Sequence, residues 1–527
     1  MEKVVAKAQE MEDGEMKEIE VNGQEVLLVK IQGEFYAVGA KCTHFGAPLA
    51  DGVLHRGRLR CPWHQACFDA ASGELEEPPA LDALSKFDTR VEDGEVIVVV
   101  PEGATSEPSP ETVEQNLEED DRTFLIIGAG GAGGAAAESL RQFGFQGRIK
   151  IVTKEKYAPY DRTQLSKNRL ADGKNGAPKL RSTDFYEEND IELLKEREVT
   201  GLDPVGKEVS FLNGDSLGYD KLLLAPGSEP NRLEVPGGEL ENVFTLRNPS
   251  DLEQINPAAE KASKVVIVGS SFIGMEAAAS LRDRGLEVTV VSLNSVPFEL
   301  VLGRRVGEVY AKTHMENGVS FEMGTRVEEF RGTDKVEEVK LADGTTLPAD
   351  LVVLGVGVTP TTSFLQGDLE LAKDGGLAVD DHLRVSKDIY AAGDVARFPD
   401  WRTDEEVRIE HWRLAQQHGR LAARNMVGEE KEFRSLPIFW TNQFDLYLRY
   451  VGHVSSWEET VLTGDLEEKQ FIAYYVRGGR VLAAAGANVN LKMAALAELM
   501  EEGEMPGPDE ISAGEFDPVE ALGELRA

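Results

Sequence analysis

The chain has 527 residues, 41% of them hydrophobic, and no run of about eighteen apolar residues that could span a bilayer. Its 94 acidic and 56 basic side chains give a formal net charge of −38, which repels phosphate backbones and anionic lipid surfaces and so argues against nucleic acid and membrane as partners. Three cysteines and an N-terminal stretch without an apolar segment argue against a disulfide-stapled secreted scaffold, and we expect a cytoplasmic protein of several domains. The acidic surface fits either adaptation to high salt or the steering of a basic partner.

The first hundred residues have the pattern of short strands. Stretches such as VLLVKIQGEFYAVG and GEVIVVV alternate apolar and polar side chains and are separated by glycine turns, which predicts an all-β domain over 1–100. The next segment, 101–121, is rich in Pro, Ser and Glu and has little to bury. We therefore expect an acidic flexible linker there.

All three cysteines lie inside this first domain. Cys42 and His44 form one pair, and after a gap of sixteen residues Cys61 and His64 form a second. One Cys and one His on each of two loops is the arrangement of a Rieske [2Fe–2S] centre, in which two cysteines hold one iron and two histidines the other. A structural zinc site is the alternative. The stretch resembles Rieske ferredoxin domains over about 1–100, and Cys67 is expected to be a packed loop residue instead of a ligand.

A strand, a glycine-rich turn and a helix are predicted over 123–144. Gly128, Gly130 and Gly133 fit the pattern that lets a pyrophosphate approach a helix N-terminus. The next strand leads to Glu155, twenty-two residues past Gly133, where a carboxylate can bind a ribose. This is the predicted FAD fold.

A second unit of the same kind is predicted over 264–285. Gly269 and Gly274 keep the pattern, but Ser271 replaces the middle glycine. The following strand ends in Ser292, where enzymes that use NADH usually carry an acid, and no arginine follows at once for a 2′-phosphate. The choice between NADH and NADPH therefore stays open.

Further signatures are APYDRTQLSK (158–167), LLLAPG (222–227), IYAAGDVARFP (389–399) and EHWRLAQQHG (410–419). Over about 123–510 the chain resembles FAD-dependent pyridine-nucleotide reductases with two dinucleotide folds. As a whole it resembles the Rieske-containing branch of apoptosis-inducing-factor-like reductases.

The resemblance assigns roles to single residues. It implies that Asp394 bonds the flavin ribitol, that Arg162 and Lys167 lie by the isoalloxazine, and that Trp412 belongs to the segment closing over the flavin. Glu276 matches an acid beside the nicotinamide. Lys167 and Glu276 are accordingly the predicted catalytic pair, with Lys167 stabilising negative charge that develops on the flavin.

The cysteine positions restrict the reaction. Disulfide reductases of this fold need a reactive cysteine near the flavin, and no cysteine follows Cys67. We expect hydride transfer from NAD(P)H to FAD, then single-electron transfer to the chain's own cluster and on to an unknown acceptor such as an oxygenase, a cytochrome or another redox protein. A redox sensor, in which FAD and NAD(H) control conformation or dimerisation, is the alternative. A third option is a cluster reduced only by an outside donor.

The expected fold class is multidomain, with an all-β Rieske domain, two Rossmann-like α/β domains and a C-terminal α+β domain that in the family can supply a homodimer surface. The expected boundaries are 1–100 for the Rieske domain, 101–121 for the linker, 122–250 and 376–430 for the two parts of the FAD domain, 251–375 for the NAD(P)H domain, 431–510 for the C-terminal domain and 511–527 for an acidic tail. Loose packing is expected from Glu501 onward.

Overall fold

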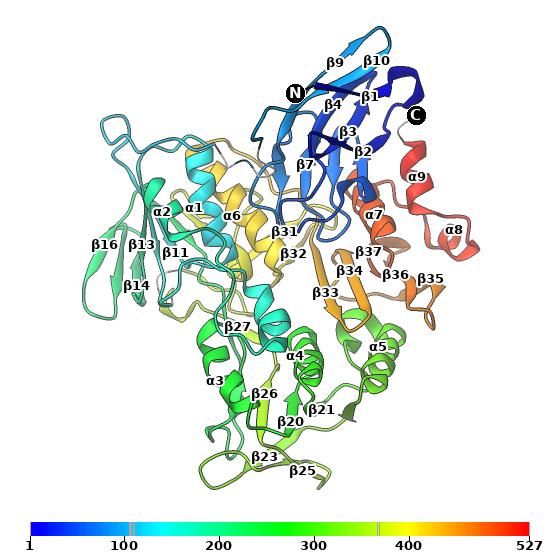
Figure 1. Cartoon of the computed structure of the whole chain (residues 1–527). Coiled ribbons are helices and arrows are strands. Elements are labelled where there is room, and N and C mark those ends of the chain that lie inside the picture. The colour runs from blue at the N-terminus through cyan, green and yellow to red at the C-terminus, as the bar shows by residue number, and fades with distance from the viewer. Residues whose placement is uncertain (1, 105–107, 109–110, 366, 368, 526–527) are drawn as a thin grey trace. The chain divides into compact units, whose positions relative to one another are not determined.

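The computed structural model describes the whole chain except residues 1, 105–107, 109–110, 366, 368 and 526–527. Its residues form two compact units. The first comprises 1–111, 435–440 and 448–527, and the second comprises 112–434 and 441–447. Figure 1 labels the helices and strands of both. Among the described residues, no helix is both long enough and apolar enough to cross a membrane.

The first unit begins with two antiparallel sheets. The larger has the order β1-β10-β9-β4-β3-β2, and the smaller has the order β5-β6-β7-β8. Alternate residues of β3 enter two different apolar clusters, because Leu27 and Val29 face one and Val26 and Leu28 face the other. The strands are β1 (Glu2–Lys7), β2 (Met16–Val21), β3 (Gln24–Ile31), β4 (Glu34–Gly39), β5 (Val53–His55), β6 (Arg58–Arg60), β7 (Cys67–Asp69), β8 (Leu75–Glu77), β9 (Lys86–Glu92) and β10 (Glu95–Val99).

The C-terminal part of the first unit is a sheet covered by helices. Its five strands have the order β33-β34-β37-β36-β35, with the hairpin residues 441–447 belonging to the second unit. Its elements are β33 (Ile438–Gln443), β34 (Leu446–Gly452), β35 (Glu459–Asp465), β36 (Gln470–Arg477), β37 (Arg480–Ala487), α7 (Asn490–Glu502), α8 (Pro508–Ala513) and α9 (Pro518–Glu524). The expectation of a loosely packed tail is wrong for its described residues, because α9 buries Leu522 to 1% exposure in an apolar cluster with α7.

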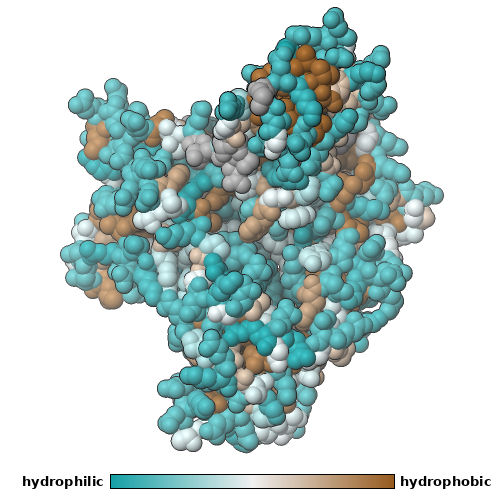
Figure 2. All heavy atoms as spheres, in the orientation of Figure 1, coloured by the Kyte–Doolittle hydropathy of each residue, from teal (hydrophilic) through white to brown (hydrophobic). Residues whose placement is uncertain are grey.

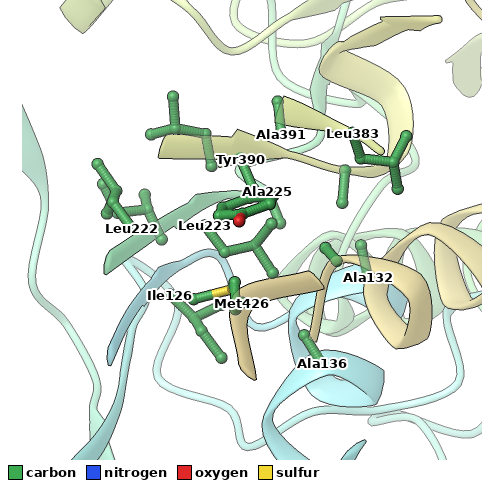
Figure 3. Packing of buried hydrophobic residues seen from close by; sticks show 14 of the residues in the cluster. Ile126, Ala132, Ala136, Leu222, Leu223, Ala225, Leu383, Tyr390, Ala391 and Met426 are labelled. Atoms are coloured by element: carbon green, nitrogen blue, oxygen red, sulfur yellow. The ribbon is translucent and has the colours of Figure 1, made fainter. Parts of the chain in front are cut away.

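The first Rossmann-like fold of the second unit has the sheet order β13-β12-β11-β17-β30-β29. Neighbours from β13 to β30 run parallel, whereas β29 is antiparallel to β30. Figure 3 shows its core, where sheet residues such as Leu223 and Tyr390 pack near Ala132 and Ala136 of α1 and Met426 of α6. The elements are β11 (Thr123–Ile127), α1 (Gly131–Gln142), β12 (Arg148–Val152), α2 (Thr183–Glu188), β13 (Ile191–Leu194), β17 (Lys221–Leu224), β29 (Arg384–Ser386), β30 (Ile389–Ala391) and α6 (Trp412–Val427).

The second Rossmann-like fold is a five-stranded parallel sheet of order β19-β26-β20-β21-β22. Its elements are β19 (Val243–Thr245), α3 (Pro249–Ala259), β20 (Lys264–Val268), α4 (Phe272–Asp283), β21 (Glu287–Ser292), α5 (Glu299–Glu316), β22 (Val319–Met323) and β26 (Leu351–Leu354). Smaller sheets complete the unit, formed by β14 (Val199–Asp203) to β16 (Ser216–Gly218), β18 (Ser228–Pro230) with β27 (Val358–Pro360), β23 (Val327–Arg331) to β25 (Thr346–Pro348), and β28 (Leu377–Ala378) with β31 (Ala396–Asp400) and β32 (Glu405–Val407).

The segment predicted as a linker is only partly separate from the folded units. The amide of Val113 donates to the carbonyl of Arg141, and the amide of Asn116 donates to that of Gln146. Residues from Thr112 onward belong to the second unit, and these two hydrogen bonds attach them to it. Part of the predicted linker, at 105–107 and 109–110, lies outside the described residues.

The face drawn in Figure 2 is mostly hydrophilic, with smaller hydrophobic areas between the hydrophilic side chains. Large exposed apolar side chains are distributed along the chain, among them Val91, Val205 and Leu300.

Candidate redox centres

The two Cys–His loops share one backbone design. In each, the carbonyl of the cysteine accepts from the amide four residues on, which belongs to Gly46 in one loop and Gln65 in the other. Both of these residues have a positive φ, 72° and 64°. The cysteine amide then donates to the carbonyl five residues on, at Ala47 and Ala66. The sequence therefore builds the same tight turn twice, with one Cys and one His on each turn.

The four predicted ligands come together in two close pairs. The Nδ1 atoms of His44 and His64 lie 3.2 Å apart. The thiols of Cys42 and Cys61, both nearly fully buried, are hydrogen-bonded to each other and form no disulfide. Backbone amides support the sulfurs, those of His44 and Phe45 at Cys42 and those of Trp63 and His64 at Cys61.

Hydrogen bonding and burial shift the pKa values of three of these four residues. The hydrogen bond with Cys61, followed by burial, raises the pKa of Cys42. Burial also acts to raise the pKa of Cys61, but the hydrogen bond from Cys42 and the backbone amides outweigh it and lower that pKa. Burial lowers the pKa of His44 to about 4, so its ring is neutral at pH 7 and has a nitrogen lone pair to give.

The distances between the ligating atoms distinguish a [2Fe–2S] site from a site for a single zinc ion. Among the described residues, three ligating atoms lie within 4.8 Å of one another only at Asp380, Asp381 and His382. The two thiols are therefore close to each other, and so are the two imidazoles. Neither cysteine sulfur lies within 4.8 Å of both histidines. One tetrahedral zinc would need all four donors within about 4 Å of one another, since its bonds are about 2.0–2.3 Å long. Two metal positions, one for each pair, fit a [2Fe–2S] cluster.

The remaining residues of this region lie on strands. Cys67 is fully buried on β7, and His55 is 2% exposed on β5. The sequence predicted a loop position for Cys67, which is wrong because Cys67 belongs to the smaller sheet. Trp440, in the same compact unit, places its ring centroid 4.6 Å from that of His64 and 6.2 Å from that of His44.

The glycines of the first dinucleotide turn have different tasks. A Cβ on Gly128 would lie 2.0 Å from the carbonyl oxygen of Ala225, and one on Gly133 would lie 1.9 Å from that of Gly128. Gly130 has no atom within 4 Å of such a Cβ, which leaves room for a ligand. No side chain caps the start of α1, so its first amides are available to a pyrophosphate.

The second turn repeats this geometry. A Cβ on Gly269 or Gly274 would lie 2.2 or 2.1 Å from a backbone oxygen, and α4 also starts without a side-chain cap. Ser271 occupies the position that corresponds to Gly130, where the first turn has open space. The departure at Ser271 therefore falls where a small side chain is tolerated. Ser292 is buried and hydrogen-bonded to Ser270 at 2.7 Å.

Predicted flavin contacts lie on several elements of the second unit. Glu155 accepts from the Tyr160 hydroxyl at 2.9 Å and from Arg162 at 3.3 Å, which brings two predicted site residues together. Asp394 pairs with Arg247 at 2.9 Å.

Trp412 starts α6 and lies against the first turn of α1. A Cβ on Gly131 would meet its ring at 3.1 Å. The open space at Gly130, the uncapped start of α1 and the polar side chains of Glu155, Arg162 and Asp394 fit FAD.

Lys167 and Glu276 form the polar centre of the second unit. The carboxylate of Glu276 is 4% exposed and accepts from Lys167 at 2.9 Å, from Thr441 at 2.7 Å and from the hydroxyl of Ser166. Lys167 stands at a break in the short helix η4 (Leu165–Arg169), with φ −109° and ψ −117°. The sequence paired Lys167 with Glu276 only by resemblance, and it missed Thr441 and Ser166.

Comparison with known proteins agrees with this geometry. Residues 122–419 match the family of pyridine nucleotide-disulphide oxidoreductases. The chain belongs to that family. Residues 1–88 match the Rieske [2Fe–2S] domain, and 438–523 match the reductase C-terminal domain.

Similar proteins share either the whole layout or the reductase part. Apoptosis-inducing factor 3 of Homo sapiens is 40% identical over 95% of this chain and 84% of its own length. The ferredoxin–NAD(+) reductase subunit of the benzene 1,2-dioxygenase system of Pseudomonas putida is 32% identical over 73% of this chain and 94% of its own.

Among solved structures, the ferredoxin reductase for the CYP199A2 system from Rhodopseudomonas palustris superposes with a TM-score of 0.73 at 31% identity, covering 77% of this chain and all of that one. The covalent putidaredoxin reductase–putidaredoxin complex gives 0.73 at 30% identity, over 77% and 99%. The predicted fold class and family are confirmed. This chain is an FAD-dependent NAD(P)H oxidoreductase of the ferredoxin reductase type fused to a Rieske domain.

Proposed function

We propose that this protein takes hydride from NADH onto FAD and delivers the electrons singly to its own Rieske cluster, which passes them to an outside redox protein. FAD supplies the conversion of a two-electron donor into single-electron steps. The observation that carries the proposal is the paired ligand set, Cys42 with Cys61 and His44 with His64, in a chain that also has a reductase site. Relatives named as ferredoxin–NAD(+) reductases support NADH as the donor and a ferredoxin-type or oxygenase partner.

In this proposal, Lys167 and Glu276 have complementary roles. Lys167 holds a positive charge where negative charge develops during reduction. Glu276, which is 4% exposed, fixes the position of the Lys167 ammonium group through an ion pair. Ser166 and Thr441 satisfy the remaining acceptor capacity of the carboxylate. The two glycine turns and the uncapped starts of α1 and α4 hold the pyrophosphates of FAD and of the pyridine nucleotide.

Two consecutive residues of β33 each contact a residue of one candidate redox site. Trp440 lies against the ligand His64, and the next residue in the chain, Thr441, donates to Glu276. One β-strand therefore supplies a contact to each redox site.

The test is an anaerobic titration with NADH that follows flavin absorbance and the Rieske EPR signal together. We expect flavin bleaching followed within one turnover by a rhombic signal of low average g. A His64→Cys variant should lose that signal and keep flavin reduction.

If the flavin is reduced while an intact cluster stays oxidised, the internal relay is refuted. The redox-sensor alternative, with which the similarity to apoptosis-inducing factor 3 is also compatible, then gains support. A sensor would show slow reduction and a long-lived charge-transfer band.

A further inference from the structure

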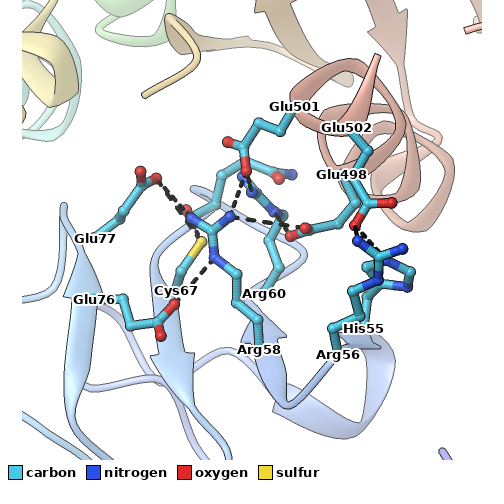
Figure 4. Close-up of polar contacts among 11 residues, drawn as sticks. His55, Arg56, Arg58, Arg60, Cys67, Glu76, Glu77, Glu498, Glu501 and Glu502 are labelled. Carbon is cyan, nitrogen blue, oxygen red and sulfur yellow. Dashed lines mark hydrogen bonds and ion pairs between the residues drawn. The ribbon is translucent and has the colours of Figure 1, made fainter. Parts of the chain in front are cut away.

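Buried ionised side chains join the smaller Rieske sheet to helix α7, within the first compact unit (Figure 4). Arg60 donates to Glu498 at 2.5 Å and to Glu501 at 2.9 Å, and Arg58 also binds Glu501. The exposed fractions of these side chains are 0% for Arg60, 4% for Glu498 and 14% for Glu501. We call Arg58, Arg60, Glu498 and Glu501 the Arg–Glu clasp.

The clasp is flanked by contacts of two other kinds. His55, on β5, lies 2.7 Å from Glu502, the last residue of α7. Val53, on the same strand, enters an apolar cluster with Ala494 and Leu499 of α7 and Leu522 of α9. Charge pairs and apolar packing thus cover one continuous face of the Rieske domain.

The buried charges of the clasp make its separation costly. The guanidinium groups of Arg58 and Arg60 stay charged, because arginine is not deprotonated in proteins. A buried charge that loses its partner is strongly destabilising, whereas exposed pairs contribute little. A surface made for repeated docking and release would place its charges at an exposed rim, where water replaces the partner. Here the charges lie in the buried centre.

We propose that the Arg–Glu clasp holds the Rieske domain on the C-terminal domain throughout turnover, so that the cluster domain does not swing on its linker. The apolar cluster around Val53 supplies affinity, and the clasp supplies the register. This arrangement differs from the mobile domain that an acidic flexible linker would allow. It does not depend on whether the flavin reduces the cluster.

Cleavage of the linker tests this in the full-length protein. A recognition sequence for a specific protease is inserted after Gly103, the holoprotein is cut, and gel filtration at micromolar concentration follows the Rieske fragment by its visible spectrum. We expect the fragment to co-elute with the rest of the chain. If the wild-type fragment elutes alone with its cluster intact, the proposal is overturned.

Variants of Glu498 on α7 and of Arg60 on β6 test whether the clasp is what retains the Rieske fragment. Glu498→Ala leaves Arg60 buried without its closest partner and does not touch the Rieske sequence, so the cluster spectrum should persist. We expect the fragment to dissociate with a Kd raised about a hundredfold or more. Arg60→Met combined with Glu498→Met should restore most of the retention, because an apolar pair of similar volume replaces the ion pair.

The matched control is Arg90→Ala. Arg90 belongs to the same domain, and its ion pairs with Glu2 and Glu92 are exposed. It should leave retention within about threefold of wild type. If Glu498→Ala retains the fragment as tightly as this control does, the clasp is not what holds the domain.

Discussion

The pair of Lys167 and Glu276 offers the sharpest test of the reductase site, because stability and rate should separate. Lys167→Met leaves the carboxylate of Glu276, 4% exposed, with the hydroxyls of Ser166 and Thr441 as its donors among the described residues. Breaking a buried ion pair costs about 3–5 kcal/mol, and the lower end applies because Lys167 is 18% exposed. We therefore expect a loss of about 3 kcal/mol in the free energy of unfolding.

A second substitution should recover the stability without recovering the rate. Glu276→Gln in the Lys167→Met background removes the unpaired charge and keeps an amide that can meet both hydroxyls. Unfolding stability should return to within about 1 kcal/mol of wild type, because a neutral pair of similar volume replaces the ions. The rate of flavin reduction by NADH should stay about a hundredfold below wild type, since the positive charge is gone.

The assays are urea unfolding followed by flavin fluorescence and anaerobic stopped-flow reduction. Glu253→Gln is the control, because its pair with Lys156 is exposed at both ends and should cost less than about 1 kcal/mol. Wild-type stability in Lys167→Met would refute the ion-pair argument. A wild-type reduction rate in the double variant would refute the role of the charge.

Four further outcomes follow from the geometry. Gly133→Ala should abolish FAD retention, measured as the flavin-to-protein absorbance ratio, since its Cβ would lie 1.9 Å from a backbone oxygen. Gly130→Ala should leave the urea midpoint of the FAD-free protein unchanged and weaken FAD binding, because the protein leaves that space open. Cys67→Ala should keep full iron content by chemical assay, since Cys67 belongs to a strand of the smaller sheet. Trp440→Leu should slow cluster reduction in stopped-flow experiments and leave flavin reduction unchanged, because its ring lies against His64.

Local backbone requirements were readable from the sequence. Gly128 and Gly133 each stand where a Cβ would collide with a backbone oxygen, so the turn imposes glycine and the pattern reveals the turn. The two Cys–His loops are similar, because each closes through its own hydrogen bonds within five residues. Both kinds of turn are determined by a few consecutive residues, so the local sequence is enough to predict them.

Contacts between distant segments were not readable. Thr441 reaches Glu276 across 165 positions, and Arg60 reaches Glu498 across 438. Nothing in the residues near Arg60 indicates a buried partner, because an arginine on a short strand is usually exposed. The packed C-terminal tail escaped prediction for the same reason. Its acidic composition suggested that the tail is exposed to solvent, whereas Leu522 packs it into an apolar cluster with α7.

The linker gives a final test that joins the relay to the clasp. If the Rieske domain had to find the reductase by diffusion on its tether, doubling the tether with Gly-Ser residues would lower the effective concentration by about threefold, following the −3/2 power of length. If the clasp keeps the domain in place, the tether carries no such task, and the rate of cluster reduction should not change. Stopped-flow measurement on wild type and on a variant extended after Gly103 distinguishes the two. A threefold slower cluster reduction, with flavin reduction unchanged, would contradict the fixed arrangement and favour a swinging domain.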